Sequence, residues 1–144
     1  MPRDMDDAEW RAFVSEGTRT AKLATTRHDG RPHVVPIWFV LDGEDFVFTT
    51  GEHSIKGRAL ARNGLAALCV DDERPPYAFV SVTGTVAISR DADELLRWAT
   101  TIGGRYMGAD RAEEFGQRNA AMDELLVRLH ADHIFAQADI AGHA

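Results

Sequence analysis

The sequence has little that would hold it together covalently or place it in a membrane. Its single cysteine, Cys69, excludes a disulfide within the chain. The longest apolar run, from Val34 to Leu41, is far too short to span a bilayer. The first ten residues, MPRDMDDAEW, are acidic, whereas a secretory signal begins with basic residues. We therefore expect a soluble, cytoplasmic protein without a membrane span.

Positive charge is also scarce. The 16 lysines and arginines are outnumbered by 23 aspartates and glutamates, which gives a net charge of −7. Because binding to a nucleic-acid backbone requires a basic surface, this balance argues against nucleic acid as the main partner. Any site for an anion must therefore be local.

Several catalytic motifs are missing as well. The sequence has no phosphate-binding P-loop, no glycine-rich dinucleotide motif between a strand and a helix, and no serine in a G-x-S-x-G frame. The closest pair of histidines, His130 and His133, straddles the expected end of a helix, so the two rings are not expected to bind one metal ion. We predict no catalytic side chain and no metal site. If the protein is an enzyme, a cofactor carries the reaction.

The 144 residues are enough for one domain, residues 1–144, with a sizeable buried core. Within it, three strand-like runs follow one another, separated by Asp-Gly pairs that favour tight turns. This alternation of strand-like runs and tight turns predicts a meander of three antiparallel strands. The runs are Thr20–Arg27, Pro32–Leu41 and Asp45–Thr50, and the turn pairs are Asp29-Gly30 and Asp42-Gly43.

The middle run is apolar on both faces, as expected of a barrel wall or an interface strand rather than a solvated sheet. It contains Pro36, which removes a backbone donor, so the strand must lie at an edge or bulge there. Either arrangement leaves backbone groups free to bind another molecule. The alternative is a bulge that only bends a barrel strand.

The rest of the pattern predicts helices placed among further strands. Together the elements indicate a β-rich α+β domain, most simply a small barrel with helices over its openings. The expected elements are a first helix capped by Asp6 or Asp7, with Trp10, Phe13 and Val14 on one face and Gly17 at its end; a helix from Ile55 to Gly64 capped by Ser54; strands Leu65–Asp71 and Tyr77–Ser89; a helix from Asp91 to Gly104; a helix from about Asp110 with Phe115, Met122, Leu125, Leu126 and Leu129 on its apolar side; and a last strand Ala131–Ile140.

The sharpest local signal lies at the start of the helix capped by Ser54. Helix N-termini offer unpaired backbone donors, and Lys56 and Arg58 add cationic side chains, so this segment could hold a phosphate. Directly before it, Thr49 and Thr50 offer hydroxyl groups that could hydrogen-bond the polar edge of a heterocycle. The alternative is a solvated basic face on a surface helix, preceded by threonines that simply favour a strand.

Three stretches together resemble a known family. LATTRHDGRPHVVPIWFVLDGEDFVFTT, IKGRALARNGLAALCVDDE and YAFVSVTGTVAI are similar to the pyridoxamine 5′-phosphate oxidase-like split-barrel proteins, in particular the branch that uses the deazaflavin coenzyme F420. The resemblance covers roughly residues 23–88. It implies an FMN-binding-like split β-barrel, capped by helices, that forms an isologous homodimer with two cofactor sites at the protomer interface.

The resemblance also implies roles for particular residues. One group of side chains would line the tricyclic ring, a second would meet its polar edge or the ribityl chain, and a third would hold the phosphate, while the partner subunit closes the site. These residues are Pro36, Ile37 and Trp38 for the ring, Thr49 and Thr50 for the edge, Lys56 and Arg58 for the phosphate, and the stretch from Tyr77 to Gly84 from the partner. Arg105 is a candidate for the polyglutamate tail of the coenzyme.

The implied activity is that of an F420-dependent oxidoreductase, which transfers hydride between the deazaflavin and a small organic substrate. An FMN-binding oxidoreductase of the same fold, and a cofactor-binding protein without turnover, are the alternatives. The chain ends ADHIFAQADIAGHA and lacks the basic, aromatic C-terminal motif of the vitamin-synthesising oxidases, which argues against pyridoxamine phosphate oxidation. Ala59 stands where the nearest branch often has asparagine, so one amide contact is lost while both cations remain.

Overall fold

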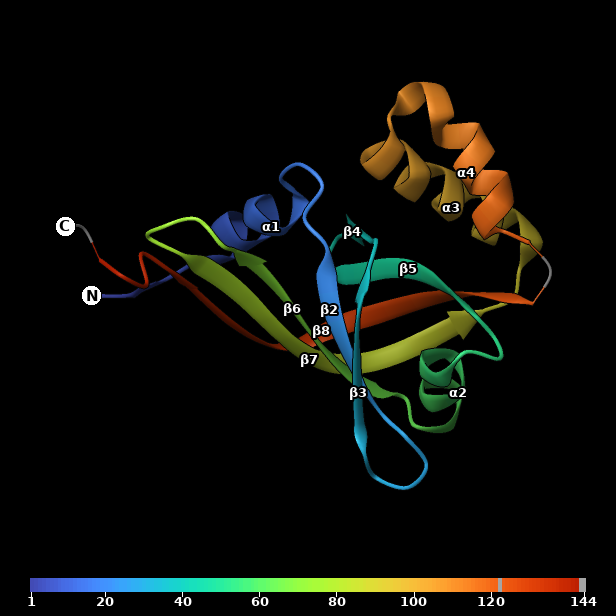
Figure 1. Ribbon diagram of the computed structural model, residues 1–144, viewed down its shortest axis with the longest axis horizontal. Coiled ribbons are helices and arrows are strands. Elements are labelled where there is room, and N and C mark those ends of the chain that lie inside the picture. Colours follow the sequence, from blue (N-terminus) through green and yellow to red (C-terminus); the bar gives the residue numbers. More distant parts are fainter. Residues whose placement is uncertain (122, 143–144) are drawn as a thin grey trace.

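The computed structural model describes residues 1–121 and 123–142 of the chain. Within these residues, eight strands form one antiparallel sheet in the order β3-β2-β6-β7-β8-β5-β4, and β1 pairs with β8 (Figure 1). The elements are β1 Arg3–Asp4, α1 Asp7–Ser15, β2 Ala21–Thr26, β3 Pro32–Ile37, β4 Val40–Asp42, β5 Asp45–Gly51, α2 Ile55–Arg62, β6 Leu65–Asp72, β7 Ala78–Ser89, α3 Ala92–Met107, the 3₁₀ helix η1 Ala109–Arg111, α4 Ala112–Asn119 and β8 Glu124–Ala138.

The connection between β3 and β4 curls the sheet into a split barrel. These strands lie at opposite ends of the sheet, yet only Trp38 and Phe39 separate them along the chain. Two residues cannot cross a flat sheet of this width, so the sheet must curve until its two ends meet. The predicted β-rich α+β barrel is therefore confirmed.

The predicted three-stranded meander is wrong. The run from Pro32 to Leu41 is not one strand, because β3 pairs with β2 and β4 pairs with β5. The chain breaks at Phe39, whose backbone N–H and carbonyl are bound by side chains of α3 instead of by a neighbouring strand. The expectation that Pro36 occupies an edge is confirmed, since β3 is a terminal strand of the sheet.

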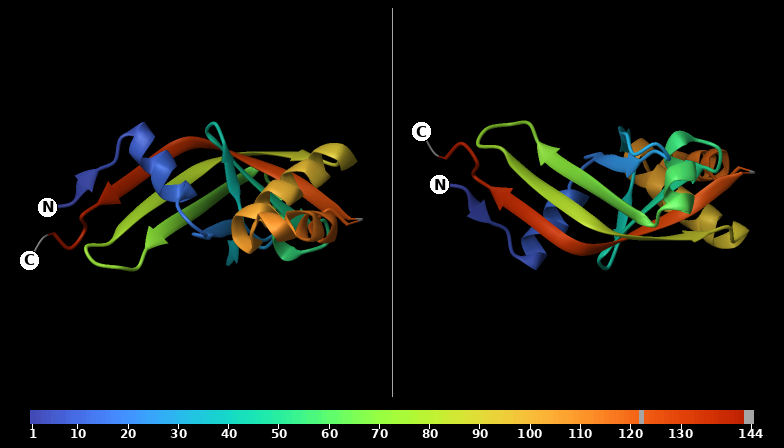
Figure 2. Two further views of the ribbon diagram at one scale, coloured as in Figure 1. Left: turned by 90° about the horizontal axis from the view of Figure 1, so that it is seen from above. Right: turned by 90° about the horizontal axis from the view of Figure 1, so that it is seen from below.

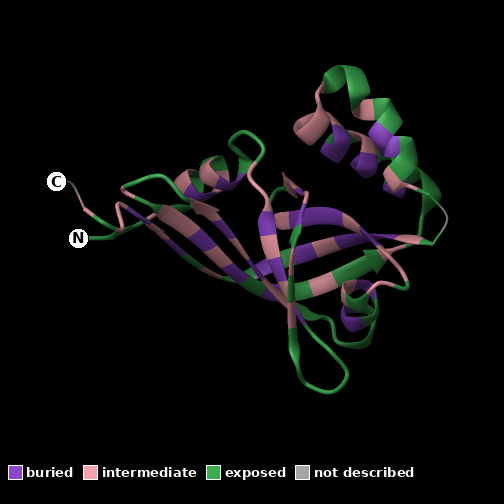
Figure 3. Cartoon of the chain, viewed as in Figure 1, coloured by how far each residue is buried: buried purple, intermediate pink, exposed green. Residues whose placement is uncertain are grey.

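Helix α1 plugs one end of the barrel. As predicted, Asp6 caps it: the side chain accepts a hydrogen bond of 2.8 Å from the Glu9 N–H. Trp10 and Val14 turn inward and are fully buried, and the Trp10 ring stacks on Phe46 at 6.0 Å. Buried and exposed positions alternate along the strands that enclose this core, most plainly along β2 and β7 (Figure 3).

Helix α2 begins where the sequence predicted. Ser54 caps it by accepting a hydrogen bond of 3.0 Å from the Gly57 N–H. A side chain at Gly57 would collide with the Gly51 carbonyl, so the glycine lets the first turn of α2 pack against the end of β5. This close packing fixes the direction in which the first residues of α2 project.

Gly84 lies at a bulge in the long β7–β8 pair. The register between these strands shifts between Thr83 and Gly84, and a side chain at Gly84 would collide with the His130 carbonyl. The glycine therefore marks both a kink in the strand and a close approach of the neighbouring backbone.

The boundaries expected in the C-terminal half are wrong. Helix α3 continues beyond Gly104 to Met107, α4 ends at Asn119, and β8 already starts at Glu124. His130 and His133 accordingly lie within β8 rather than at the end of a helix. Met122, which was expected on the apolar side of the second helix, lies outside the described residues.

The first half of β8 was mistaken for a helix because it is buried on both faces. Leu125, Leu126 and Val127 are consecutive and all fully buried. One face lines the barrel, whereas Leu126 packs with Trp98 and Leu95 of α3 on the other. A strand that is covered on both sides has a continuous apolar sequence. It lacks the alternation of apolar and polar residues that indicates a half-buried strand.

Helices α3 and α4 pack against each other beside the end of the sheet opposite to the two chain termini (Figure 2). The described residues contain no helix long and apolar enough to cross a membrane.

Candidate functional site

One cavity collects six of the eight cofactor-binding residues that the sequence predicted. It has a volume of about 330 Å³ and lies where the end of β3, the end of β5 and the start of α2 meet; we call it the candidate cavity. Residues of α3, α4 and β8 complete its wall. Its lining consists of Pro36, Ile37, Trp38, Thr49, Thr50, Gly51, Lys56, Ile102, Asn119 and Glu124.

The barrel topology explains this convergence. Thr49 and Thr50 end β5, and the turn that follows brings Lys56 back over them in the first turn of α2. Closure of the barrel places the end of β3 beside them, although β3 and β5 are not neighbours in the sheet. The lining is apolar where β3 contributes and polar where β5 and α2 contribute, which suits a flat ring carrying a charged tail.

The hydroxyl of Thr50 is restricted to one role toward a ligand. Ser54 donates its single proton to the Gly51 carbonyl at 2.8 Å and accepts from the Gly57 N–H. The contact of 3.1 Å between the hydroxyls of Thr50 and Ser54 must then use the proton of Thr50. Thr50 is left as an acceptor, able to receive an N–H from a heterocycle but unable to donate to a phosphate.

Trp38 lines the cavity, and one face of its ring is covered by Tyr106. Its ring stacks on Tyr106 at a centroid distance of 5.0 Å with the planes 4° apart, and Phe115 lies tilted against it at 6.0 Å. Contacts of this kind fix the indole plane without any ligand. Trp38 is therefore a rigid wall of the candidate cavity.

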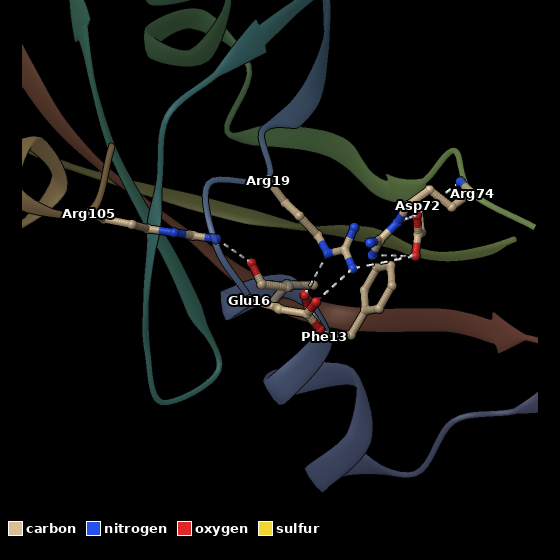
Figure 4. A network of polar contacts seen from close by, with 7 residues as sticks. Phe13, Glu16, Arg19, Asp72, Arg74 and Arg105 are labelled. Atoms are coloured by element: carbon tan, nitrogen blue, oxygen red, sulfur yellow. Dashed lines mark hydrogen bonds and ion pairs between the residues drawn. The ribbon is translucent and has the colours of Figure 1, made fainter. Parts of the chain in front are cut away.

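Arg105 and Tyr106, which we call the α3 anchor, hold the break between β3 and β4. The guanidinium of Arg105 donates to the carbonyls of Val14, Gly17 and Phe39 at 2.7, 2.9 and 2.7 Å, reaching the turn after α1 (Figure 4). The Tyr106 hydroxyl accepts from the Phe39 N–H at 3.2 Å. Burial lowers the pKa of Arg105 and raises the pKa of Tyr106. All three nitrogens of Arg105 are engaged by the scaffold, which leaves it poorly placed to bind a polyglutamate tail.

The turn between α1 and β2 also carries ion pairs (Figure 4). Arg19 lies 3.5 Å from a carboxylate oxygen of Glu16 and 3.6 Å from one of Asp72. Hydrogen bonds from Arg74 lower the pKa of Asp72 to about 2. These contacts tie the α1–β2 turn to the end of β6, outside the candidate cavity.

Four residues of the cavity lining were not predicted as site residues, and Glu124 is the ionisable one among them. Its Oε2 atom is buried, and no hydrogen-bond partner for it lies among the described residues. Burial raises the pKa of this carboxyl, while the positive charge of Lys56 acts in the opposite direction. The sequence pattern predicts a helix over this position, whereas Glu124 is the first residue of β8. The available signal was an acidic residue directly before the buried run that starts at Leu125.

Two predicted residues lie away from the cavity in this chain. Arg58 is two positions after Lys56 and so projects from the opposite side of α2, into a hollow shared with Arg62 and Arg90. Tyr77 precedes β7 and lies at the far end of the sheet, in a hollow lined by acidic residues and Phe79. Neither side chain contributes to the described lining of the candidate cavity.

A larger cavity of about 530 Å³ lies on the outer face of β2, β6 and β7. Small residues form part of its lining, among them Ala24, Ala66 and Ala67. The hydroxyl of Thr25 is buried there, and no partner for it lies among the described residues. Leu65 in its rim is 60% exposed.

Comparison with known proteins identifies relatives of both the sequence and the fold. The sequence profile described as "Pyridoxamine 5′-phosphate oxidase" matches residues 6–138. A curated relative, a pyridoxine/pyridoxamine 5′-phosphate oxidase from Hyphomonas neptunium, is 41% identical over 63 residues. The matched stretch covers 43% of this chain and only 29% of that relative.

Two solved structures share the fold over most of their length. Protein Rv2991 from Mycobacterium tuberculosis aligns with a TM-score of 0.82 and 24% identity, covering 94% of this chain and 86% of the other. A structure described as an F420 reductase aligns with a TM-score of 0.71 and 27% identity, covering 85% of this chain and 94% of the other.

Proposed function

The chain belongs to the pyridoxamine 5′-phosphate oxidase family, whose fold binds flavins and deazaflavins, and from this premise we propose that it is an F420-dependent reductase. In this proposal the reduced deazaflavin, bound in the candidate cavity, supplies a hydride to a small electron-poor organic substrate. The likeness to an F420 reductase over 85% of the chain favours the deazaflavin.

The observation that carries the proposal is the composition of the candidate cavity. It combines a rigid aromatic and apolar wall at Trp38 and Pro36, an acceptor at Thr50 and a cation at Lys56. A coenzyme with a flat ring, ring N–H groups and a phosphate needs these three kinds of partner. The residues present therefore fit such a group.

The protein's part in the reaction is to bind, orient and shield. Pro36, Ile37 and Trp38 would hold the ring plane, Thr49 and Thr50 would bind its polar edge, and Lys56 would fix the phosphate. Holding the donor carbon at a set distance from the acceptor lowers the entropic part of the barrier, and excluding water protects the transferred hydride.

We also propose that the functional unit is a homodimer. Val34 on the terminal strand β3 is 63% exposed, and Leu65 on β6 is 60% exposed beside the larger cavity. A second copy placed on this face would cover both side chains and an open strand edge. Such an arrangement would allow Tyr77 of the second copy to approach the cofactor, and Arg58 would need to extend around α2 to assist Lys56.

A flavin-dependent oxidoreductase of the same fold is the second candidate. Its support is the 41% identity to a pyridoxine/pyridoxamine 5′-phosphate oxidase, which is confined to 63 residues. The matched stretch covers only 29% of that relative, so we do not propose its substrate for this chain.

Turnover tests the reductase proposal. Reduced deazaflavin would be mixed anaerobically with the protein and a panel of quinones, enones and tetrapyrroles, and its oxidation followed by absorbance. We expect at least one acceptor to be reduced in proportion to the deazaflavin oxidised, and to be reduced far more slowly by the Lys56→Ala variant. Flavin-dependent turnover with no use of the deazaflavin would replace this proposal with the second candidate.

A further inference from the structure

We propose that Glu124 is a ligand-binding residue of the candidate cavity that acts as the neutral carboxylic acid, so that a phosphate-bearing ligand binds together with one proton. This inference rests on the proposed function, because it assumes that the cavity receives an anionic cofactor. It concerns a residue to which neither the sequence motifs nor the family resemblance gives a role.

The first argument is geometric. Glu124 begins β8 opposite Gly51 of β5, so its side chain starts at the same edge as Thr50. The carboxyl lines the candidate cavity, and its buried Oε2 atom has no partner among residues 1–121 and 123–142. A buried polar atom without a partner is costly unless a ligand or water completes it.

The second argument concerns charge. Among the described residues that line the cavity, Lys56 is the single cation and Glu124 the single acid. An ionised Glu124 would offset the charge of Lys56 and repel a phosphate bound in the same cavity. A neutral Glu124 leaves Lys56 free to attract the phosphate and removes the repulsion.

The third argument concerns donors. The hydroxyl of Thr50 donates its proton to Ser54, so toward a ligand it can only accept a hydrogen bond. A protonated carboxyl has one O–H to donate, whereas a carboxylate has none. Protonation therefore turns Glu124 from a repelling group into a hydrogen-bond donor for the anion.

Other titratable groups lie around this end of the molecule. They are Glu52 and His53 in the turn after β5, Arg90 beyond β7, Lys56 on α2 and Asp123 beside Glu124 in the chain. Glu52 is paired with Arg90 at 2.9 Å. Of the five, Lys56 is the group whose charge acts on the carboxyl of Glu124. His53 lies in the same turn as Glu52, so the experiment must separate its effect from that of Glu124.

The test measures the affinity of the deazaflavin coenzyme as a function of pH. The coenzyme has ionisable groups of its own, so the difference between the unmodified protein and a variant reports on Glu124. For the unmodified protein, Kd should rise with pH above the pKa of Glu124 in the free protein, by up to about tenfold per pH unit. The Glu124→Gln variant keeps the shape and a donor but cannot ionise. Its Kd should rise less steeply over the same range, and it should bind more tightly than the unmodified protein at high pH.

Two controls and a direct measurement make the result specific. Glu113→Gln, on the exposed side of α4, makes the same change in net charge and should leave the pH profile unchanged. His53→Asn should also retain the slope. Calorimetry in two buffers with different ionisation enthalpies should show more proton uptake on binding for the unmodified protein than for Glu124→Gln.

The outcomes separate the two proposals. Equal pH profiles for the unmodified protein and Glu124→Gln, or a slope that disappears only in His53→Asn, would overturn the role of Glu124. Loss of binding in Glu124→Gln at every pH would also overturn it, because the carboxylate would then be needed as an acceptor. If FMN binds and the deazaflavin does not, the reductase proposal fails, and the difference between the two proteins with FMN still tests Glu124. Binding of neither cofactor would overturn both.

Discussion

The α3 anchor and the pair formed by Lys56 and Glu124 are two polar clusters that differ in how far their hydrogen-bonding capacity is satisfied. Arg105 donates hydrogen bonds to three backbone carbonyls, and the Tyr106 hydroxyl accepts a hydrogen bond from the backbone N–H of Phe39. Glu124, by contrast, has a buried oxygen without a partner among the described residues. A satisfied buried group is part of the scaffold, whereas an unsatisfied one beside a cavity is suited to a ligand.

This contrast assigns different consequences to substitutions in the two clusters. Changes in the α3 anchor should lower the free energy of unfolding, because they leave buried backbone groups unpaired. Changes in the pair of Lys56 and Glu124 should alter ligand affinity and leave stability nearly unchanged.

The largest expected effect is on stability, from Arg105→Met. The substitution keeps much of the apolar stem but leaves the carbonyls of Val14, Gly17 and Phe39 without their donor. We expect the free energy of unfolding to fall by about 3 kcal/mol, measured by urea denaturation. The control is Arg97→Met on the exposed side of the same helix, which should cost less than about 1 kcal/mol. Similar losses in the two variants would contradict the anchoring role.

Lys56→Ala should affect binding rather than stability. The variant loses a charge-assisted contact of about 1.5 to 3 kcal/mol. Its affinity for the deazaflavin coenzyme, measured by fluorescence titration, should therefore fall by more than about tenfold. Arg58→Ala, which removes a cation from the opposite side of α2, should weaken it less. An equal or greater loss in Arg58→Ala would show that the phosphate lies nearer to the Arg58 side of the helix.

Tyr106→Phe should produce a smaller change within the α3 anchor. The phenyl ring retains the stack against Trp38, but the hydroxyl that donates to the Arg19 carbonyl at 2.7 Å is lost. We expect a loss of about 1 to 2 kcal/mol in thermal or urea unfolding and an unchanged cofactor affinity. A large loss of affinity with unchanged stability would move Tyr106 from the scaffold to the site.

The smallest expected effect is the pH dependence of stability caused by Glu124. Its folded-state pKa is raised above the ordinary 4.5, so the folded protein holds this proton more tightly than the unfolded chain. Its contribution to stability is fully present below the unfolded pKa and is lost as the pH rises through the folded pKa. Above that pH, Glu124→Gln should be more stable than the unmodified protein by less than about 1 kcal/mol, allowing for solvent screening. A stability difference that does not change with pH would contradict the raised pKa.

Local chemistry made part of the fold predictable. Asp6 and Ser54 each cap a helix at the position expected, because a cap depends on a few neighbouring residues. Pro36 indicated an edge strand because the missing donor is a property of the residue itself. The resemblance to a split-barrel family then supplied the closure of the sheet.

Long-range packing decided the rest. No local signal in the run from Pro32 to Leu41 shows that its halves pair at opposite ends of the sheet, because the break at Phe39 depends on Arg105 and Tyr106 far along the chain. The start of β8 was unpredictable for a similar reason, since α3 buries its outer face. The mistaken boundary concealed Glu124, which joins the cavity only because β8 begins there.

The most direct test of the account is a parallel titration of the purified protein, and of its Lys56→Ala variant, with the deazaflavin coenzyme and with FMN, followed by fluorescence. The account predicts saturable binding of the deazaflavin in preference to FMN, weakened in the variant by more than about tenfold. Preference for FMN would contradict the proposed cofactor. Undiminished deazaflavin binding in Lys56→Ala would contradict the assignment of the candidate cavity as its site.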